Sequence, residues 1–599
     1  MSNPTAPITP RSLPRALAHA LARHSTQAFG LMGNGNAHFI DELPAAGIAL
    51  TTVRHEAATV AAADAYARVS HRLAIATTTY GPGFTNALTA LAEAAQARTP
   101  LILVAGDAPT SGTRPSDVDQ EMLAAAMGVR TVTLSLRDLD ETVDRAVASV
   151  QRLRRPLVLA IPHDLVAAPV ASGNAEPEFI DLDDPEVMRA LVASTMPAAP
   201  AATPLTGRPA TGAHPDDLAA AREALAGARR PLILAGRGAH LAGAGGELAH
   251  LASQLGALTA TTALARGIFT DATHDLGVAG GFGQESAMAL VTQADVVVVV
   301  GASLNPFTMR FGELFGEGTT IIRIDTDNVA APASSREITH LLLRGDAKSV
   351  LQMLIIDLAD TRLSGSDWPE PITGLESPSS ALRVRETGIT EHPDGRCADG
   401  RLDPRAVAAR LAELLPGDRH VTSDGGHFIG WANMFWPVAA PERMIMVGTA
   451  FQTIGLGLAT VPGVAAAAPE STVVLTVGDG GCLMGLADLH TAITSAASCV
   501  IVVWNDAAYG AEVHLYGAMG LSETAMRLAP ADLASVARSL GATGVRVESL
   551  TDLEALRAWV EAGSRGTILL DCAISPSVVA PYQTEIQRAH GVHPAPLQP

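Results

Sequence analysis

The chain has 599 residues, of which 48% are hydrophobic and 17% are charged, and its formal net charge is −20. This length exceeds what one hydrophobic core usually serves and indicates three to four domains, while the composition excludes a largely disordered chain. The negative charge argues against nucleic acid or an anionic membrane as a partner. An anionic substrate would therefore need a locally positive site.

The cysteines and the N-terminus indicate the cellular compartment. Cys397, Cys482, Cys499 and Cys572 show no paired Cys-x-x-Cys spacing, so their pattern indicates neither a zinc site nor a disulfide framework. The first residues lack the continuous apolar segment of a signal peptide, and no run of 18 apolar residues occurs in the chain. We therefore expect a cytoplasmic protein in a reducing environment.

Apolar strand candidates alternate with helix-length segments in three stretches, residues 1–185, 216–360 and 401–575. Such alternation is typical of doubly wound α/β domains built on parallel sheets. Residues 186–215 and 361–400 break the pattern with Ala, Pro, Thr, Ser and Gly, so we interpret them as linkers. Residues 576–599 form a polar tail. The prediction is three α/β domains of similar class without a short-period repeat.

The first domain contains a candidate catalytic carboxylate. Glu56 follows Arg54-His55 at the start of an Ala-rich segment of helical length. A first-turn glutamate can simply complement the helix dipole, a contribution of about 0.3–1 kcal/mol. Further along, the segment 80–83 (Tyr-Gly-Pro-Gly) predicts a tight loop, which is also the ordinary behaviour of a Pro-Gly turn. Gln120 reads, on sequence alone, as a polar residue on a helix surface.

The middle domain is less informative. The segment 236–239 (Gly-Arg-Gly-Ala) follows an apolar strand and could cradle a phosphate, although a single glycine turn is a weak signal. No Gly-x-Gly-x-x-Gly with an acidic residue about 20 positions later follows the first strand, which argues against a nicotinamide dehydrogenase.

The third domain contains two acidic turns. An apolar run over 473–477 ends in Gly478-Asp479-Gly480-Gly481, and a second run over 499–504 ends in Asn505-Asp506. A right-handed βαβ crossover brings both strand ends to one edge of a parallel sheet, although 27 positions separate the two aspartates. Two carboxylates there would repel each other, so a cation should lie between them. Oxygen ligands beside a glycine loop and a helix N-terminus favour Mg²⁺ holding a diphosphate.

The alternative interpretation is local: Asp479 caps a helix and Asp506 forms an Asx turn. Two other residues of this domain can also be explained without a functional role. His427, in the segment 424–427, could be a structural histidine with satisfied hydrogen bonds. Ile454, in the segment 449–457, could be an ordinary buried aliphatic residue.

The two acidic turns resemble the diphosphate and magnesium signature of thiamine diphosphate (ThDP) enzymes, with Asp506 in place of the more common Asn. The first domain resembles the pyrimidine-binding domain of acetolactate synthase large subunits and related decarboxylases. The resemblance implies that Asp479, Asp506 and the carbonyl of Ala508 bind Mg²⁺, and that Glu56 bonds N1′ of the aminopyrimidine. It also implies that the carbonyl of Gln452 accepts from the 4′-amino group and that Ile454 supports the bent cofactor. The remaining cofactor-binding residues implied are Pro82, Asn86, Gly426, His427, Gly478, Gly480, Gly481, Tyr509 and Gly510.

The segment 505–512 has the spacing found in pyruvate decarboxylases, where the final glutamate faces the substrate carbons. By this resemblance Glu512 handles protons, together with Gln120 and His514. The adjacent His-His pair of those decarboxylases is absent. The synthases' Arg-Phe-Asp-Asp-Arg segment is also absent, because 304–310 reads Leu-Asn-Pro-Phe-Thr-Met-Arg, which puts bound FAD in doubt.

The resemblance therefore implies a ThDP- and Mg²⁺-dependent carboligase that decarboxylates a 2-oxo acid and transfers the remaining carbons to a second carbonyl. The alternatives are simple 2-oxo acid decarboxylation or C–C lyase activity, and a non-catalytic ThDP-binding subunit, against which the presence of both Glu56 and Glu512 argues. Family members place their active sites between subunits, so we expect a homodimer or homotetramer.

Overall fold

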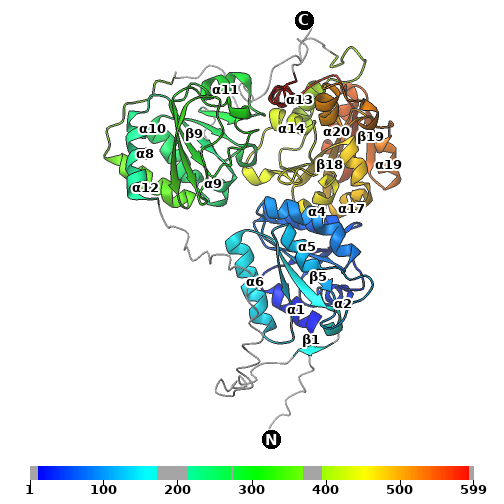
Figure 1. Cartoon of the computed structure of the whole chain (residues 1–599). Helices are drawn as coiled ribbons and strands as arrows, with labels where there is room; N and C mark the ends of the chain where they lie inside the picture. The colour runs from blue at the N-terminus through cyan, green and yellow to red at the C-terminus, as the bar shows by residue number, and fades with distance from the viewer. Residues whose placement is uncertain (1–10, 167, 171–212, 271–273, 369–393, 593–599) are drawn as a thin grey trace, which may run out of the picture.

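The computed structural model describes residues 11–166, 168–170, 213–270, 274–368 and 394–592 (Figure 1). Three α/β bodies are visible, each built on a six-stranded sheet, which confirms the predicted fold class. The predicted linkers 186–215 and 361–400 lie mostly outside the described residues, as does the end of the predicted tail. Among the described residues no helix has the length and apolar character needed to cross a membrane.

The first domain has the strand order β3-β2-β4-β5-β7-β6, with every pairing parallel. Its central strands β4 and β5 are apolar and buried along almost their whole length, as expected for a sheet covered on both faces. The strands are β2 (Gln27–Gly30), β3 (Ala49–Thr52), β4 (Ala74–Thr78), β5 (Leu101–Asp107), β6 (Arg130–Thr133) and β7 (Leu157–Pro162). The helices are α1 (Leu13–Ala22), α2 (Ala37–Glu42), α3 (Glu56–Ser70), α4 (Pro82–Gln96), α5 (Gln120–Ala126) and α6 (Leu139–Leu153), and β1 (Arg11–Ser12) pairs antiparallel with β8 (Pro169–Val170).

The third domain has the order β16-β15-β17-β18-β20-β19, again all parallel. Counted within each domain, this is the same order as in the first domain, 2-1-3-4-6-5. The strands are β15 (Arg419–Ser423), β16 (Met444–Met446), β17 (Thr472–Gly478), β18 (Ser498–Asn505), β19 (Thr543–Val547) and β20 (Gly566–Ala573). The helices are α13 (Pro404–Leu414), α14 (Ile429–Phe435), α15 (Gly457–Ala467), α16 (Asp479–Met484), α17 (Leu489–Ser495), α18 (Gly510–Glu512), α19 (Leu533–Ser539), α20 (Glu554–Glu561) and α21 (Pro581–Ala589).

The middle domain differs. Its order is β11-β10-β9-β12-β13-β14, which is 3-2-1-4-5-6 when counted within the domain. That is the order of the doubly wound dinucleotide-binding fold. The strands are β9 (Pro231–Ala235), β10 (Leu258–Thr261), β11 (Asp275–Val278), β12 (Val296–Val300), β13 (Thr319–Asp325) and β14 (Ile338–Arg344). The helices are α8 (Pro215–Gly227), α9 (Arg237–Leu241), α10 (Gly245–Leu255), α11 (Glu285–Val291) and α12 (Ala347–Ala359).

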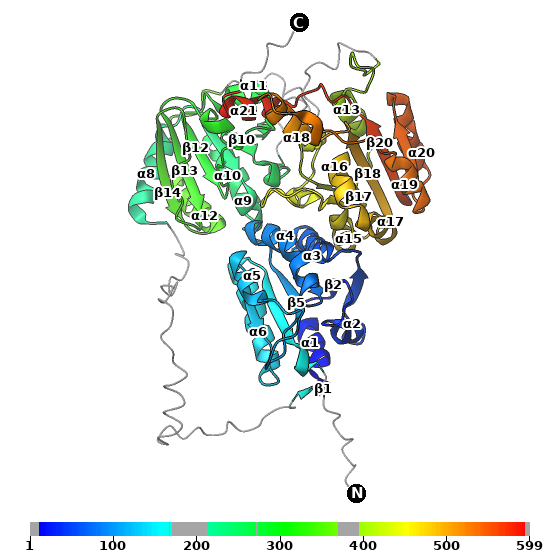
Figure 2. The same ribbon diagram turned by 45° about the vertical axis from the view of Figure 1, so that its right-hand side comes forward.

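The first and third domains share one hydrophobic core, because α3 packs directly against α15 (Figure 2). Both helices are rich in small residues, so their backbones come close together. A Cβ atom added to Gly463 of α15 would lie 2.0 Å from the carbonyl oxygen of Ala62 in α3. No side chain fits at that distance, and the glycine is therefore required by the helix crossing.

Substituting this glycine tests the crossing. We expect Gly463→Ala to destabilise the protein by about 1–3 kcal/mol or more, because the helices must separate to admit the methyl group. Gly246→Ala is the matched control, since Gly246 is also helical but has open space around its Cα. Alanine there should be neutral or stabilising by up to about 1 kcal/mol. Apparent melting temperatures measure both, and equal effects in the two variants would contradict the close crossing.

Candidate functional site

The two acidic turns of the third domain lie side by side. Strands β17 and β18 pair in parallel register with Gly478 opposite Trp504, so Asp479 and Asp506 leave the same edge of the sheet. The Asp479 carboxylate accepts backbone N–H groups of Gly480 and Ala507, which ties one turn to the other. Asp506 Oδ1 accepts from the N–H of Ala508 at 3.1 Å. Both aspartates are buried.

This proximity is electrostatically unfavourable. Burial raises the pKa of Asp479 to about 7, and the nearby charge of Asp506 adds to the shift. Burial also raises the pKa of Asp506 to about 6, although Arg527 and Arg401 partly oppose it. A cation between the carboxylates would relieve both the desolvation and the repulsion. The all-oxygen donor set suits Mg²⁺.

Three glycines leave room around the aspartates. A Cβ atom on Gly480 would lie 2.6 Å from the ring of Tyr509, and one on Gly510 would lie 2.8 Å from Asp506 Oδ2. A Cβ atom on Gly481 would lie 2.6 Å from Asp424 Oδ2. Any larger residue would push these turns apart. The turns thus present backbone N–H groups and carboxylates in close quarters, which fits a metal-bound diphosphate.

Asp424 organises the neighbouring loop, and the sequence analysis did not single it out. Its fully buried carboxylate accepts from Gly425 N at 2.8 Å and from Gly455 N at 2.9 Å, and it also accepts N–H groups at the start of α15. Burial raises its pKa to about 6, and the backbone N–H groups oppose the shift. An Asp-Gly-Gly turn after a buried strand was the only available signal in the sequence.

The loop anchored by Asp424 holds the predicted residues Gln452 and Ile454. Gln452 has φ of 59°, a left-handed conformation that is uncommon for a residue other than glycine. Ile454 lies against the turn after β15, since a Cβ atom on Gly425 would be 3.2 Å from its Cγ2 atom. The loop therefore adjoins the segment that contains Gly426 and His427, and the strained backbone at Gln452 is held by the surrounding contacts.

In the first domain, Glu56 and Asn86 come together from two helices. Glu56 is half-buried at the start of α3, and its Oε2 atom accepts from Asn86 Nδ2 of α4 at 3.0 Å. The predicted residue Pro82 opens α4 beside Gly83, where an added Cβ atom would lie 3.5 Å from Glu56 Oε1. The tight loop and the carboxylate therefore belong to one constellation.

Gln120 forms hydrogen bonds that hold the loop before Pro82. Its side chain is buried, and its Oε1 atom accepts from the N–H of Gly81 at 2.9 Å. Its Nε2 atom donates to the carbonyl of Gly106 at 2.8 Å. The surface-helix alternative is excluded by this burial. The amide holds the loop before Pro82 in place.

Two neutral histidines line the other side of the third-domain turns. His427 Nε2 accepts from the N–H of Ala580 at 2.9 Å, so this nitrogen has no proton. Burial lowers the pKa of His427 well below its usual value, with a smaller contribution from His514. Burial, and then Arg527, lower the pKa of His514 to about 4. The ring centroids of the two histidines are 4.5 Å apart.

Helix α21 holds these histidines and lies in the stretch predicted as a polar tail. The hydroxyl of Tyr582 donates to the carbonyl of His427, and the amide of Gln587 donates to the carbonyl of His514. Sequence reasoning missed this role, because the helix is short and amphipathic and its partners are more than 70 residues away.

Glu512, by contrast, is exposed at the end of α18, where the chain enters a π-helical turn over Val513–Gly517. Such turns frequently occur at functional sites.

The two domains that supply these constellations are joined by buried charges. Arg68 of α3 donates to both Asp64 oxygens at 2.7 and 2.6 Å, and to Glu93 of α4 at 3.1 Å. It also donates to the carbonyl of Met446, while the second oxygen of Glu93 accepts from the N–H of Phe451 at 2.7 Å. The loop that precedes Gln452 is thereby fixed to the first domain.

The glycine turn of the middle domain is closed. The N–H of Gly236 donates to the carbonyl of Val300 at 2.8 Å, and the N–H of Gly238 donates to Gly301 at 2.9 Å. A Cβ atom on Gly236 would lie 2.4 Å from the carbonyl oxygen of Gly301. These N–H groups are already bonded, so the turn does not offer them to a phosphate of FAD or another nucleotide.

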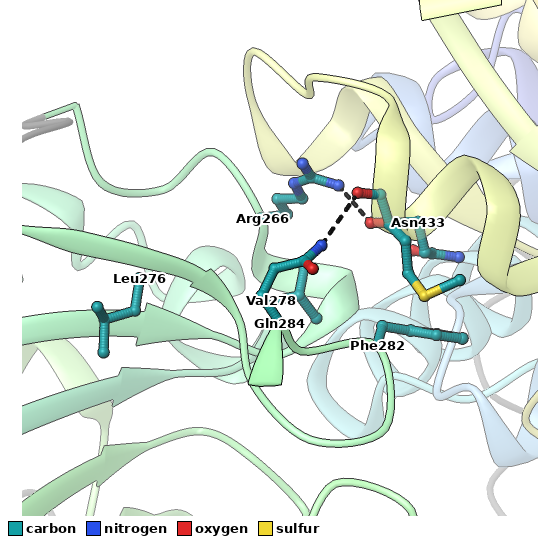
Figure 3. Close-up of a pocket in the computed structure, with 7 residues that line it drawn as sticks. Arg266, Leu276, Val278, Phe282, Gln284 and Asn433 are labelled. Carbon is teal, nitrogen blue, oxygen red and sulfur yellow. Dashed lines mark hydrogen bonds between the residues drawn. The ribbon is translucent and has the colours of Figure 1, made fainter. Parts of the chain in front are cut away.

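A small cavity lies at the seam between the middle domain and α14 (Figure 3). Arg266 Nη1 donates to the carbonyl of Asn433 at 2.6 Å, and Gln284 Nε2 is 3.5 Å from the carbonyl of Met434. Both side chains span the cavity from the middle domain to the third domain. The cavity therefore belongs to the interdomain packing.

Comparison with known proteins gives consistent matches along the chain. Three family profiles match: "Thiamine pyrophosphate enzyme, N-terminal TPP binding domain" over residues 11–127, its central domain over 218–354, and its C-terminal TPP binding domain over 424–572. The chain is 27% identical over 568 residues to a sulfoacetaldehyde acetyltransferase of Alcaligenes xylosoxydans xylosoxydans, covering 89% of this chain and 87% of that protein. It is 27% identical over 547 residues to the acetolactate synthase isozyme 3 large subunit of Escherichia coli K12, covering 88% of each.

Among solved structures, the fold is similar to a thiamine diphosphate-dependent 4-hydroxybenzoylformate decarboxylase of Rhodococcus jostii RHA1. The TM-score is 0.71 at 20% identity, and the match covers 94% of this chain and 99% of that one.

The buried aspartates predict an unusual pH dependence in protein freed of divalent cations. A carboxyl group whose pKa is raised by folding stabilises the fold below its ordinary pKa and loses that contribution as the pH rises through the raised value. For Asp479 this window runs from 3.8 to about 7. Asp479→Asn cannot ionise. The difference in unfolding free energy between this variant and the wild type should therefore shift in favour of the variant, by on the order of 2–4 kcal/mol between pH 4 and pH 8.

Denaturant unfolding of both proteins at several pH values, in the presence of a chelator, measures this difference. Asp41→Asn, at an exposed helical position, is the control for removing a carboxylate that is not buried. Added Mg²⁺ should reverse the order by stabilising only the wild type. A constant difference between Asp479→Asn and the wild type would show that Asp479 is not strained by its surroundings.

Proposed function

The chain belongs to the thiamine diphosphate enzymes of the acetolactate synthase and pyruvate decarboxylase family, and from this premise we propose that it is a ThDP- and Mg²⁺-dependent carboligase. Its first substrate is a 2-oxo acid, and a second carbonyl compound accepts the carbons that remain after loss of CO₂. The observation that carries the proposal is the pair of buried aspartates at adjacent strand ends, whose charges a bound cation would neutralise.

Asp479, Asp506 and the carbonyl of Ala508 are proposed to hold Mg²⁺. The burial of both carboxylates and the close approach of Gly480 and Gly510 support this assignment. Backbone N–H groups at the start of α16 would bind the diphosphate. The other residues proposed for this region are Gly426, His427, Gly478, Gly481 and Tyr509.

Glu56 is proposed to control the proton at N1′ of the pyrimidine. The hydrogen bond from Asn86 fixes its carboxylate in one orientation, and Pro82 bounds the same space. The carbonyl of Gln452 would accept from the 4′-amino group, and Ile454 would support the cofactor from the third domain. When bound, ThDP supplies a nucleophilic carbon that adds to the 2-oxo acid carbonyl and an electron sink for decarboxylation.

Glu512 is proposed to donate or relay protons at the substrate carbons, and its exposed position leaves it free to do so. His514 is neutral at physiological pH, since its pKa is lowered to about 4, and would therefore act as an acceptor in such a relay. Gln120 is proposed to act through the loop that it holds. Carboligation is preferred because the first domain most resembles the acetolactate synthases, and relatives named as an acetyltransferase and an acetolactate synthase support it.

A second candidate function is simple decarboxylation or C–C cleavage. The spacing from Asn505 to Glu512, which is that of the pyruvate decarboxylases, favours it. In either case we propose a homodimer or homotetramer. Large apolar side chains support assembly because they are exposed near the candidate site: Met32 (61%), Phe451 (45%) and Met484 (59%).

Proton NMR of the full-length protein incubated with ThDP, Mg²⁺ and pyruvate tests the proposed function. We expect acetolactate or acetoin to accumulate. Glu56→Gln should lower the rate by about 100-fold or more, because a neutral amide cannot share the N1′ proton, while ThDP affinity changes little. ThDP binding without pyruvate consumption would preserve the family assignment but exclude pyruvate as the 2-oxo acid. An active Glu56→Gln variant would overturn the assigned role.

Glu512 separates the two candidate functions. If the protein is a carboligase, Glu512→Gln should lower aldehyde release by about tenfold or more, because protonation of the substrate carbons is impaired, and carboligation should persist. Glu561→Gln, at an exposed helix end in the same domain, is the control and should leave both products unchanged. Aldehyde as the main wild-type product, lost together with all turnover in Glu512→Gln, would favour the decarboxylase function instead.

A further inference from the structure

Three potential metal ligands meet where the three domains meet, and the activity proposed above does not use them. His71 directly follows α3 in the first domain, His240 lies in α9 of the middle domain, and Glu442 lies in the short 3-10 helix Pro441–Arg443 of the third domain. In Figure 2, α9 lies at the edge of the middle domain that faces the other two. The ligand atoms of the three side chains all lie within 4.8 Å of one another.

The three side chains are close to the arrangement that they would need to bind one metal ion. His240 Nε2 is 3.7 Å from Glu442 Oε2, and the ring centroids of His71 and His240 are 5.1 Å apart. Zinc bonds of about 2.0–2.2 Å in a tetrahedral arrangement place ligand atoms roughly 3.3–3.6 Å apart. The three side chains therefore need to close by about an ångström. His71 is exposed, so its ring can turn to meet the other two.

His240 gives independent support. Its Nε2 atom is buried and makes no hydrogen bond within the part of the chain that the structure describes. Glu442 Oε2, at 3.7 Å, is beyond hydrogen-bonding distance. A buried nitrogen without a partner has a free-energy cost, which a ligand in this space would remove.

The chemistry of the donors indicates which ligand this is. Burial lowers the pKa of His240, so its imidazole is neutral and presents a lone pair at physiological pH. Arg237, which neighbours the cluster, adds a positive charge that opposes cation binding, while Glu442 adds a compensating negative one. Two imidazoles and one carboxylate form a mixed nitrogen and oxygen set that suits zinc better than magnesium or calcium.

The backbone at His71 is also unusual. This residue has φ of 56° at the end of α3, a left-handed position that usually carries glycine. The backbone of a histidine at this position is in an energetically unfavourable conformation. The conformation places its ring beside His240 of another domain.

We propose that His71, His240 and Glu442 bind one Zn²⁺ ion that joins the three domains of this chain. Water would complete the tetrahedron, and the role proposed for the ion is to hold the domains together. The site lies at the opposite end of α3 from Glu56, and the 15 residues of that helix span about 22 Å. Local sequence spacing cannot reveal this site, because each ligand comes from a different domain.

The test uses the full chain with the diphosphate site filled. Protein is stripped of transition metals, returned to saturating Mg²⁺ and ThDP so that Asp479 and Asp506 are occupied, and titrated with Zn²⁺ by calorimetry. Co²⁺, followed by visible absorption, reports the coordination geometry. We expect one Zn²⁺ per chain, a tetrahedral Co²⁺ spectrum, and a Zn²⁺-dependent increase in melting temperature.

Variants assign the ligands. His240→Ala and Glu442→Gln should each weaken Zn²⁺ binding by about tenfold or more and abolish the increase in melting temperature. His250→Ala, at an exposed position of α10 in the same domain as His240, should bind like the wild type. Glu442 is partly exposed, so its substitution decides the question if His240→Ala does not fold. Absence of Zn²⁺ binding by the wild type, or wild-type affinity in both ligand variants, would overturn the proposal.

Discussion

The join between the first and third domains depends on the charge of Arg68. Asp64 and Glu93 are completely buried, and the one guanidinium that bonds to both is itself 5% exposed. Removing one partner from such a network leaves uncompensated buried charge, which typically costs about 3–5 kcal/mol. Arg68 also bonds the carbonyl of Met446, and Glu93 bonds the N–H of Phe451. The same charged side chains that hold α3 to α4 therefore set the position of the loop that carries Gln452.

Packing and charge are coupled at this join. The crossing at Gly463 brings α15 against the backbone of α3, so the hydrophobic cores of two domains merge. Asp424 then bonds the first residues of α15 and the loop before it. Helix α15 thus connects the close backbone contact at Gly463 with the carboxylate of Asp424, which in turn lies against Gly481 of the first acidic turn.

The sequence alone was sufficient to predict the features that depend on local patterns. Alternating apolar runs predicted three parallel α/β domains, and the turns after β17 and β18 predicted that Asp479 and Asp506 converge, because adjacent parallel strands end at one edge. Long-range partners were not predictable. The burial of Gln120, the hold of Tyr582 on His427 and the bonds made by Asp424 all depend on which segments meet in space. Nor does periodicity distinguish strand order 2-1-3-4-6-5 from 3-2-1-4-5-6, since both read as alternating strands and helices.

The middle domain has the strand order of a nucleotide-binding fold, but its first glycine turn is closed by the backbone after β12. Gly236 and Gly238 serve contact with the peptide at Gly301, so the glycines that elsewhere admit a phosphate here admit a neighbouring loop. A phosphate bound at this turn would have to displace the peptide at Gly301 from both N–H groups. The first turn of this domain therefore works as an internal brace between β9 and β12, and its glycines are needed for that brace whether or not any ligand binds nearby.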